Sequence, residues 1–246
     1  MKNNFKILLF FKILFCVNIS FSQNFDYLPK STTNQIVKHT YYSLSYSEEN
    51  EQAEWVAYMI TSGRTNGTLK RSDKFIPDPM ITTKSAISND YKKSGYDRGH
   101  LAPAADMKFD EIAMSECFYM SNMSPQLPGF NRGIWKKLEE KVRNWALTED
   151  TLYIITAGVL TGIDKRIGEN GVGVPKLFYK IILKNSVNEK KAIAFCIPNQ
   201  KSDKSIYEYI VNIDKIEELT GIDFFPNLSD KIENKLESQI NINLWK

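Results

Sequence analysis

Three β-rich runs in the second half of the chain limit its fold more than any other feature of the sequence. They span residues 152–160, 176–183 and 191–197, and each is rich in aliphatic and aromatic residues. Segments containing glycine, aspartate and asparagine separate them at intervals typical of hairpins, which predicts an antiparallel sheet. Residues 53–61 form a similar run and also read as a strand.

Helical patterns are fewer. The clearest covers residues 131–147, where apolar residues recur at three- and four-residue steps and form one stripe: Ile134, Trp135, Leu138, Val142 and Trp145. Short helices are expected over residues 110–117 and 213–219, and a short strand over residues 117–121. Strands mixed with few helices, without regular alternation of the two, predict the α+β class.

The N-terminus has the pattern of a targeting segment. Lys2 and Lys6 precede an apolar run over residues 7–17, and small residues follow it. The run is too short to span a membrane, so we expect a secretory signal peptide over residues 1–22. An uncleaved membrane anchor is the alternative.

The rest of the chain shows no repeat and no low-complexity segment. Residues 23–50 are polar and are expected to form an irregular lead-in, followed by a single domain over residues 51–246. With the signal peptide removed, the expectation is a secreted or periplasmic protein with no membrane partner.

Net charge does not indicate a binding partner. Residues 1–22 carry three lysines and no acid, so the remaining chain has 29 basic and 29 acidic residues. Global basicity therefore gives no argument for nucleic acid binding. The charge is mildly asymmetric, because residues 203–246 have a net charge of −4 and residues 23–202 the opposite.

The remaining cysteines and one histidine have structural interpretations. Cys117 and Cys196 lie in apolar runs, and both a disulfide and two buried free thiols are compatible with this position. His39 lies in a polar stretch and is expected at the surface.

Chemically useful residues are concentrated in the run Tyr-Asp-Arg-Gly-His at residues 96–100. A lone histidine is more often structural than catalytic. His100, however, lies in one short run with Arg98 and Gly99. Its imidazole is largely neutral at pH 7 and can act as a general base. Arg98 can bind phosphate with a planar, permanently charged fork, and Gly99 permits a sharp turn or close approach of a ligand. Asp97 is expected to fix the local turn. This combination favours a phosphodiesterase, with a nuclease as the leading interpretation.

Asn131 and Glu139 lie further along the chain, at the predicted long helix. An asparagine oxygen can bind a hard cation such as Mg²⁺, although Asn131 could equally cap the helix. Glu139 follows after about two helical turns and would lie on roughly the same side, where a carboxylate could hold metal-bound waters. Pairing with Lys136 or Arg143 at the surface is the alternative.

Three segments resemble the DNA/RNA non-specific endonucleases, the endonuclease G-like, sugar-non-specific ββα-metal nucleases. Residues 96–103 are similar to the DRGH signature of that family, residues 121–126 to its strand-end motif, and residues 131–139 to its metal-binding helix. The order and separations agree with the family, and residues 216–226 resemble its C-terminal segment. The resemblance implies a ββα-metal nuclease fold with a central, mainly antiparallel sheet flanked by helices.

The resemblance also implies roles for the residues of the metal site. His100 would be the general base that activates water. Asn131 would be the single direct protein ligand of one Mg²⁺ ion, with Mn²⁺ able to replace it, and Glu139 would anchor the metal-bound waters.

The phosphate-binding and supporting residues follow from the same resemblance. Arg98 would bind the phosphate, and Arg71 is the best candidate for a second phosphate-binding arginine, with Arg64 as a nearby competitor. Asn122 would lie near the site and support its geometry.

The expected activity is Mg²⁺-dependent cleavage of DNA and RNA through contacts with the phosphate backbone, which leaves a 5′-phosphate and a 3′-hydroxyl. Two alternatives stay open: a nucleic-acid-binding module that has lost catalysis, and a phosphodiesterase of the same fold with another substrate. The sequence leaves the oligomeric state open, with a homodimer as one option.

Overall fold

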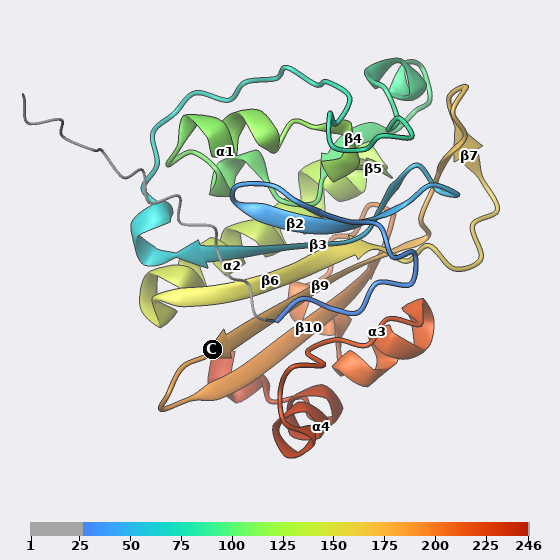
Figure 1. Ribbon diagram of the computed structural model, residues 1–246. Helices are drawn as coiled ribbons and strands as arrows, with labels where there is room; N and C mark the ends of the chain where they lie inside the picture. The colour runs from blue at the N-terminus through green and yellow to red at the C-terminus, as the bar shows by residue number, and fades with distance from the viewer. Residues whose placement is uncertain (1–26, 246) are drawn as a thin grey trace, which may run out of the picture.

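The computed structural model describes residues 27–245, so the signal peptide expected over residues 1–22 lies outside the described residues. Within the described chain, seven strands form one antiparallel sheet in the order β1-β2-β3-β6-β9-β10-β11 (Figure 1). The strands are β1 (Ile36–Lys38), β2 (Tyr42–Ser47), β3 (Gln52–Thr61), β6 (Thr151–Gly158), β9 (Leu177–Asn185), β10 (Lys190–Pro198) and β11 (Ile210–Val211). This arrangement confirms the predicted α+β class with a mainly antiparallel central sheet.

The predicted irregular lead-in over residues 23–50 is wrong for residues 36–47, because these residues form β1 and β2 at one edge of the sheet. Tyr42, Leu44 and Tyr46 alternate with serines and are buried. Ser45 and Ser47 are buried as well, so the polar serines concealed a strand that is buried on both faces.

Two small hairpins lie outside the main sheet. The first joins β4 (Asp97–His100) to β5 (Met123–Gln126), and the second joins β7 (Arg166–Ile167) to β8 (Val172–Gly173). The strand predicted over residues 117–121 is wrong: this segment contains a turn that follows the helix Glu111–Glu116, an isolated bridge residue, Tyr119, and the start of a 3₁₀ turn, Met120–Asn122, that leads into β5.

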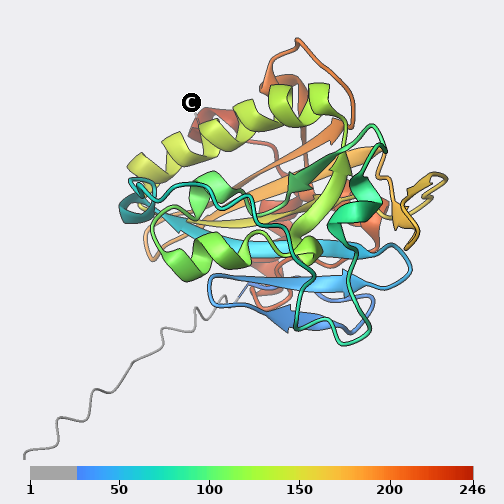
Figure 2. The same cartoon turned by 90° about the horizontal axis from the view of Figure 1, so that it is seen from above.

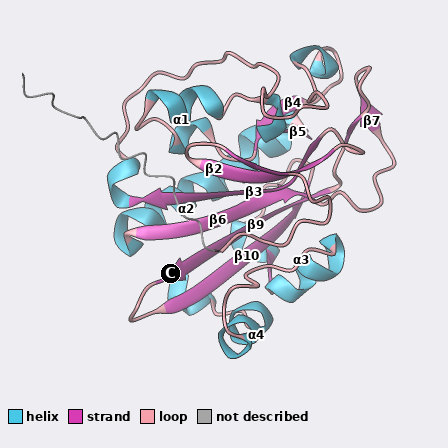
Figure 3. Cartoon of the chain, in the orientation of Figure 1, coloured by secondary structure: helices cyan, strands magenta, loops and turns pink. Residues whose placement is uncertain are grey.

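The helices are placed around the sheet (Figure 3). The main ones are α1 (Glu111–Glu116), α2 (Lys136–Glu149), α3 (Ile213–Thr220) and α4 (Asp230–Ser238). Two of them have sequence-encoded caps: the Asp110 side chain accepts from the first-turn amides of α1, and Gly221 ends α3 in the left-handed conformation (φ 72°). Helix α4 was not predicted.

Helix α2 positions the candidate site. It runs across one face of the sheet and contacts β3 and β6 (Figure 2). Its predicted apolar stripe is confirmed, because Leu138, Val142, Trp145 and Ala146 are buried. Burying such side chains contributes roughly 1.5–3 kcal/mol each for the large ones, which anchors the helix to the sheet.

The remaining helices lie at the two ends of the sheet. Helix α1 and the β4–β5 hairpin lie on the side of β2 and β3, whereas α3 and α4 lie beside β10 (Figure 1). No helix among residues 27–245 combines the length and apolar character needed to cross a bilayer.

Candidate active site

A cavity of about 460 Å³ opens between the β4–β5 hairpin and the start of α2. Its lining includes five of the six residues that the sequence nominated, and these come from segments up to 68 positions apart: Arg71, Arg98, His100, Asn131 and Glu139. The sixth, Asn122, does not line it. Tertiary packing thus brings together the base, the metal ligand and the phosphate-binding groups that the motifs suggested.

His100 is fixed by the hairpin and by aromatic neighbours. It pairs with Met123 across the β4–β5 ladder, and its ring packs edge-on against Phe75 and Phe118, with centroid distances of 5.8 and 4.8 Å. The ring is buried, and its Nε2 atom has no hydrogen-bond partner among the described residues. An unpaired buried ring nitrogen is costly for stability, which favours a role in chemistry over one in structure.

The surroundings of His100 favour the neutral imidazole. Burial is the main cause and, with the positive charges of Arg71 and Arg98, lowers the pKa of His100 to about 3. The ring is therefore neutral throughout the physiological pH range and keeps a lone pair that can accept a proton.

Gly99 of the DRGH run is required by packing against the hairpin partner. A Cβ atom at this position would lie 2.2 Å from the side-chain carbonyl of Gln126 on β5. Gly99 pairs with Ser124 in the ladder. The expected close approach is therefore made by a neighbouring side chain of the protein itself.

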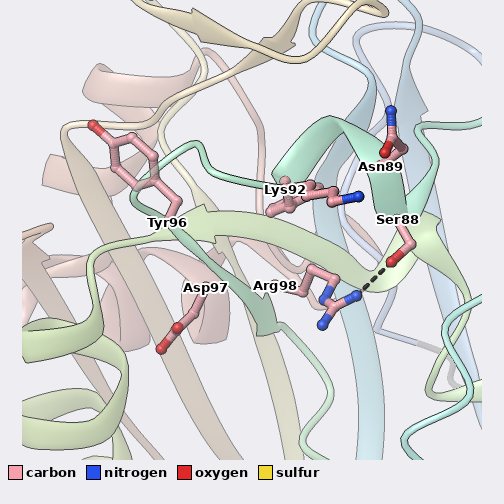
Figure 4. Close-up of a pocket in the computed structure, with 7 residues that line it drawn as sticks. Ser88, Asn89, Lys92, Tyr96, Asp97 and Arg98 are labelled. Atoms are coloured by element: carbon pink, nitrogen blue, oxygen red, sulfur yellow. Dashed lines mark hydrogen bonds between the residues drawn. The ribbon is translucent and has the colours of Figure 1, made fainter.

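Two arginines flank His100 with different degrees of constraint. Arg98 donates a hydrogen bond to the Ser88 hydroxyl (Figure 4). Its guanidinium lies 4.0 Å from the centroid of the Phe75 ring. Arg71 is more exposed, pairs with Asp73 at 2.5 Å and lies over the Phe118 ring. Arg64, the competing candidate, packs over Phe109 and does not line the cavity.

Asn131 is held by a carboxylate from the DRGH run. Its side-chain nitrogen donates to Asp97 at 2.9 Å, and Arg132 donates two hydrogen bonds to the same carboxylate at 2.9 and 2.6 Å. Burial acts to raise the pKa of Asp97, but the hydrogen bonds from Arg132 and Asn131 hold it below its usual value. Asp97 therefore links the hairpin to the helix start and orients Asn131, rather than only fixing a local turn.

The backbone around Asn131 explains why it does not cap the long helix. Residues Phe130–Trp135 form a separate wide turn, interrupted at Gly133 (φ −104°, ψ −110°), and α2 begins only at Lys136. Because the side-chain nitrogen Nδ2 of Asn131 donates to Asp97, the side-chain oxygen Oδ1 is available to a ligand in the cavity. Asn131 and Glu139 supply the oxygen donors that a hard divalent cation prefers, so these residues fit a metal such as Mg²⁺.

Glu139 faces a buried network of charges. Burial raises the pKa of Glu139, and the charges of Lys180 and Arg143 partly oppose this effect. Lys180 is fully buried, and its Nζ atom lies 4.9 Å from the Trp135 ring without a hydrogen-bond partner among residues 27–245. The surface pairings considered for Glu139 are absent from the described residues, because Lys136 pairs with Glu140 instead.

Arg143 is a cavity residue that the sequence reasoning did not nominate. It donates to Asp106 at 2.7 Å, and Tyr58 donates to the other oxygen of the same carboxylate at 2.9 Å. Its position one turn after Glu139 was the available signal, since residues four apart share a helix face. Arg132 and Lys136 also line the cavity, where they pair with Asp97 and Glu140.

Asn122 has a supporting position. It is fully buried, its side-chain oxygen accepts from the Ala102 amide at 2.9 Å, and its nitrogen donates to the carbonyls of Ala102 and Cys117 at 3.0 and 2.8 Å. These bonds hold the chain that follows His100. Asn122 therefore has no direct access to a ligand in the cavity.

The structure also decides the expectations for His39 and for the pair Cys117 and Cys196. His39 was expected at the surface, and this is wrong: its side chain is 1% exposed and bonds to Asp78 at 2.9 Å. Cys117 and Cys196 are both free thiols, so the disulfide alternative is not realised.

The comparison with known proteins decides the family. The sequence profile described as DNA/RNA non-specific endonuclease matches residues 23–231. The chain belongs to this family. It is 36% identical over 209 residues to the human mitochondrial nuclease EXOG, an alignment that covers 77% of this chain and 56% of EXOG. It is 33% identical over 220 residues to a nuclease of Nostoc sp., which covers 85% and 79% of the two chains.

The solved structures agree with this family assignment. A crystal structure of the EndoG/EndoGI complex matches with a TM-score of 0.74 and 32% identity, and covers 80% of this chain and 88% of that chain. This match confirms the ββα-metal nuclease fold, and the relatives are named nucleases, in agreement with the predicted enzyme class. The chain spans 56% of the length of human EXOG, so that protein has further segments with no counterpart in the alignment.

The names of the relatives correct the predicted location. EXOG and endonuclease G from several animals are mitochondrial proteins by name, which contradicts the secreted or periplasmic location expected for this chain. Secretory and mitochondrial targeting segments are both N-terminal, basic and poor in acidic residues. Lys2 and Lys6 therefore did not distinguish between them.

Proposed function

We propose that this protein is a divalent-metal-dependent endonuclease that hydrolyses phosphodiester bonds in both DNA and RNA. The observation that carries the proposal is the shared cavity, in which a neutral buried histidine, two oxygen donors and several arginines face one another. Membership in a family of nucleases supports it.

His100 would act as the general base. A neutral imidazole accepts the proton of an attacking water, and positive charge on the ring is disfavoured next to Arg71 and Arg98. The bound phosphodiester would bring negative charge between these groups and make the protonated ring less costly. The base is thus expected to work best when substrate is present.

Asn131 and Glu139 would hold the metal, Asn131 directly and Glu139 through water. Mg²⁺, with Mn²⁺ as a substitute, would stabilise negative charge on the phosphate and on the leaving oxygen. The protein's own contribution would be orientation: Asp97 accepts a hydrogen bond from the Asn131 side chain, and Glu139 lies in the first turn of α2. The expected products carry a 5′-phosphate and a 3′-hydroxyl.

Arg98 and Arg71 would bind the phosphate oxygens. Contacts restricted to the backbone do not read the base sequence, which is consistent with acceptance of both DNA and RNA.

Digestion of plasmid DNA and total RNA by the full-length protein tests the proposal. The reactions contain Mg²⁺, Mg²⁺ with excess chelator, or Mg²⁺ with the His100→Ala variant. Cleavage of both nucleic acids only with free metal and intact His100 is the expected result. Cleavage that survives the His100→Ala change would contradict the assigned base, and absence of any cleavage by the wild type would contradict the function.

A further inference from the structure

A second cavity of about 480 Å³ lies next to the candidate active site (Figure 4). It is formed by the 3₁₀ turn Ser88–Tyr91, by Lys92 and by the start of β4. Arg98 lines both cavities, so the two share one guanidinium as their common wall. A ligand that extends past Arg98 from the active site therefore enters this second cavity.

The wall of this second cavity is firmly held. Asp90 is buried, accepts from the Ile87 amide at 2.8 Å and accepts from the Asn170 side chain at 2.8 Å. These bonds connect the 3₁₀ turn to the neighbouring β7–β8 hairpin. The cavity is thus preorganised rather than a chance gap between loose segments.

The charges of the cavity favour an anion. Lys92 is exposed and forms no ion pair with any residue in the range 27–245, and Arg98 is bonded only to the neutral Ser88 hydroxyl there. The one acidic group in the lining, Asp97, is already neutralised by Arg132. Two cationic groups therefore remain available to a ligand.

The polar and aromatic groups narrow the ligand further. Tyr91 is 5% exposed, and its hydroxyl has no hydrogen-bond partner among the described residues, although it lines the cavity. Such a group favours an oxygen-rich ligand or its bound water. Tyr96 has the Lys165 amino group over its ring at 4.9 Å, which occupies one face and leaves it poorly suited to stack a base.

We propose that this second cavity binds the sugar-phosphate backbone of the nucleotide next to the scissile bond, with Lys92 contacting its phosphate. This inference rests on the proposed function and extends it: the enzyme would grip at least two consecutive phosphates of one strand. Recognition through phosphate and sugar leaves the base unread, in agreement with non-specific cleavage.

The test compares Lys92→Gln with Lys93→Gln in the full-length protein. Lys93 is the adjacent exposed lysine, carries the same charge and does not line the cavity. Steady-state kinetics with Mg²⁺ use a single-stranded DNA of roughly 20 nucleotides, and bis(4-nitrophenyl) phosphate as a diester without a flanking nucleotide. Binding of the fluorescently labelled DNA in chelator is measured by anisotropy over a series of salt concentrations.

For K92Q we expect the ratio of KM for the DNA to KM for the small diester to rise about five-fold. In the binding measurement, the slope of log affinity against log salt should become shallower by about 0.7, the value for one phosphate contact of a single strand. K93Q should retain the wild-type ratio and slope. Equal changes of the KM ratio and of the salt slope in K92Q and K93Q would contradict the proposed contact between Lys92 and the phosphate.

The binding measurement separates this inference from the proposed function. If the wild type cleaves neither substrate but K92Q alone weakens DNA binding, the catalytic proposal fails and the subsite stands. If cleavage occurs as proposed and K92Q binds and cleaves DNA like K93Q, the subsite fails and the catalytic proposal stands. Melting curves of both variants check that each is folded.

Discussion

The chain contains two histidines in the residues described, and their surroundings are opposite. His39 is buried against Asp78, and the same carboxylate also accepts from the Ser121 hydroxyl. His100 is buried against two aromatic rings, faces two arginines and has an unpaired Nε2. Burial alone thus does not distinguish a structural histidine from a chemical one. The distinguishing feature is whether the fold supplies the ring with a partner.

The effect on Asp78 shows the structural character of the first histidine. Burial acts to raise the pKa of Asp78, yet the hydrogen bond and charge of His39 hold it below its usual value. The His39–Asp78 pair joins the turn between β1 and β2 to the loop that precedes β4. Among residues 27–245 nothing equivalent stabilises the ring of His100, and its position there is maintained by packing against Phe75 and Phe118.

Replacing His100 by alanine is expected to have the largest effect of any single change. Loss of a general base lowers kcat by roughly 10²–10⁴-fold. Because the ring has no partner for Nε2, the free energy of unfolding should change little beyond the loss of packing against Phe75 and Phe118. Initial rates of plasmid nicking and chemical denaturation measure the two quantities. A kcat within a factor of a few of the wild type would remove the distinction between the histidines.

Replacing His39 by alanine is expected to give the reverse pattern. The change leaves Asp78 buried without its partner, which should lower the free energy of unfolding by roughly 3 kcal/mol. The activity of the folded fraction should stay near that of the wild type, since His39 does not line the active-site cavity. Urea denaturation and active-site-normalised rates measure both. Double replacement of His39 and Asp78 by apolar residues should recover part of the stability.

An intermediate effect is expected for Asp97, the carboxylate nearest to the candidate base in the sequence. It bonds to Asn131 and Arg132 and not to His100, so it should affect the metal rather than the base. Asp97→Ala should raise the Mg²⁺ concentration for half-maximal activity by roughly 10–100-fold, as is usual for groups that orient a metal ligand. Activity should return at high Mg²⁺. A matched control is Asp164→Ala, which removes an exposed carboxylate that pairs with Lys176 outside the active-site cavity. Loss of activity that metal cannot restore would instead assign Asp97 to the base.

The sequence located the candidate site residues better than the contacts that hold them in place. His100, Asn131 and Glu139 were identifiable because their motifs are short and local in sequence. The residues that hold them were not, because Asp97–Arg132 and Arg143–Asp106 are contacts between segments 35 and 37 positions apart. No local pattern encodes such pairs.

The secondary structure likewise contains elements that a local pattern reveals and elements that it does not. Long β-rich runs and the apolar stripe of α2 were predictable because burial imposes a periodicity on each element. β2 was missed because serines alternate with its apolar residues, and β1 was missed because it is only three residues long. Residues 117–121 were assigned to a strand although their apolar side chains pack in turns. His39 was misplaced for a related reason: its partner Asp78 is 39 positions away, so the polar stretch around it appeared solvated.

The last expected effect concerns how stability depends on pH, and it is the smallest when taken over a single pH unit. The pKa of His100 is about 3 in the folded chain and near 6.5 when unfolded. Between these values the unfolded chain binds a proton that the folded chain excludes, so stability falls as pH decreases through this window. The contribution of His100 is therefore fully present above about pH 6.5, and its loss is at most about 1.4 kcal/mol per pH unit below that. Urea denaturation of the wild type and of His100→Asn over this range should show a steeper acid loss for the wild type. Parallel curves would mean that the ring takes up a proton in the folded state, and the contrast with His39 would then lie in the partner each ring has rather than in its charge.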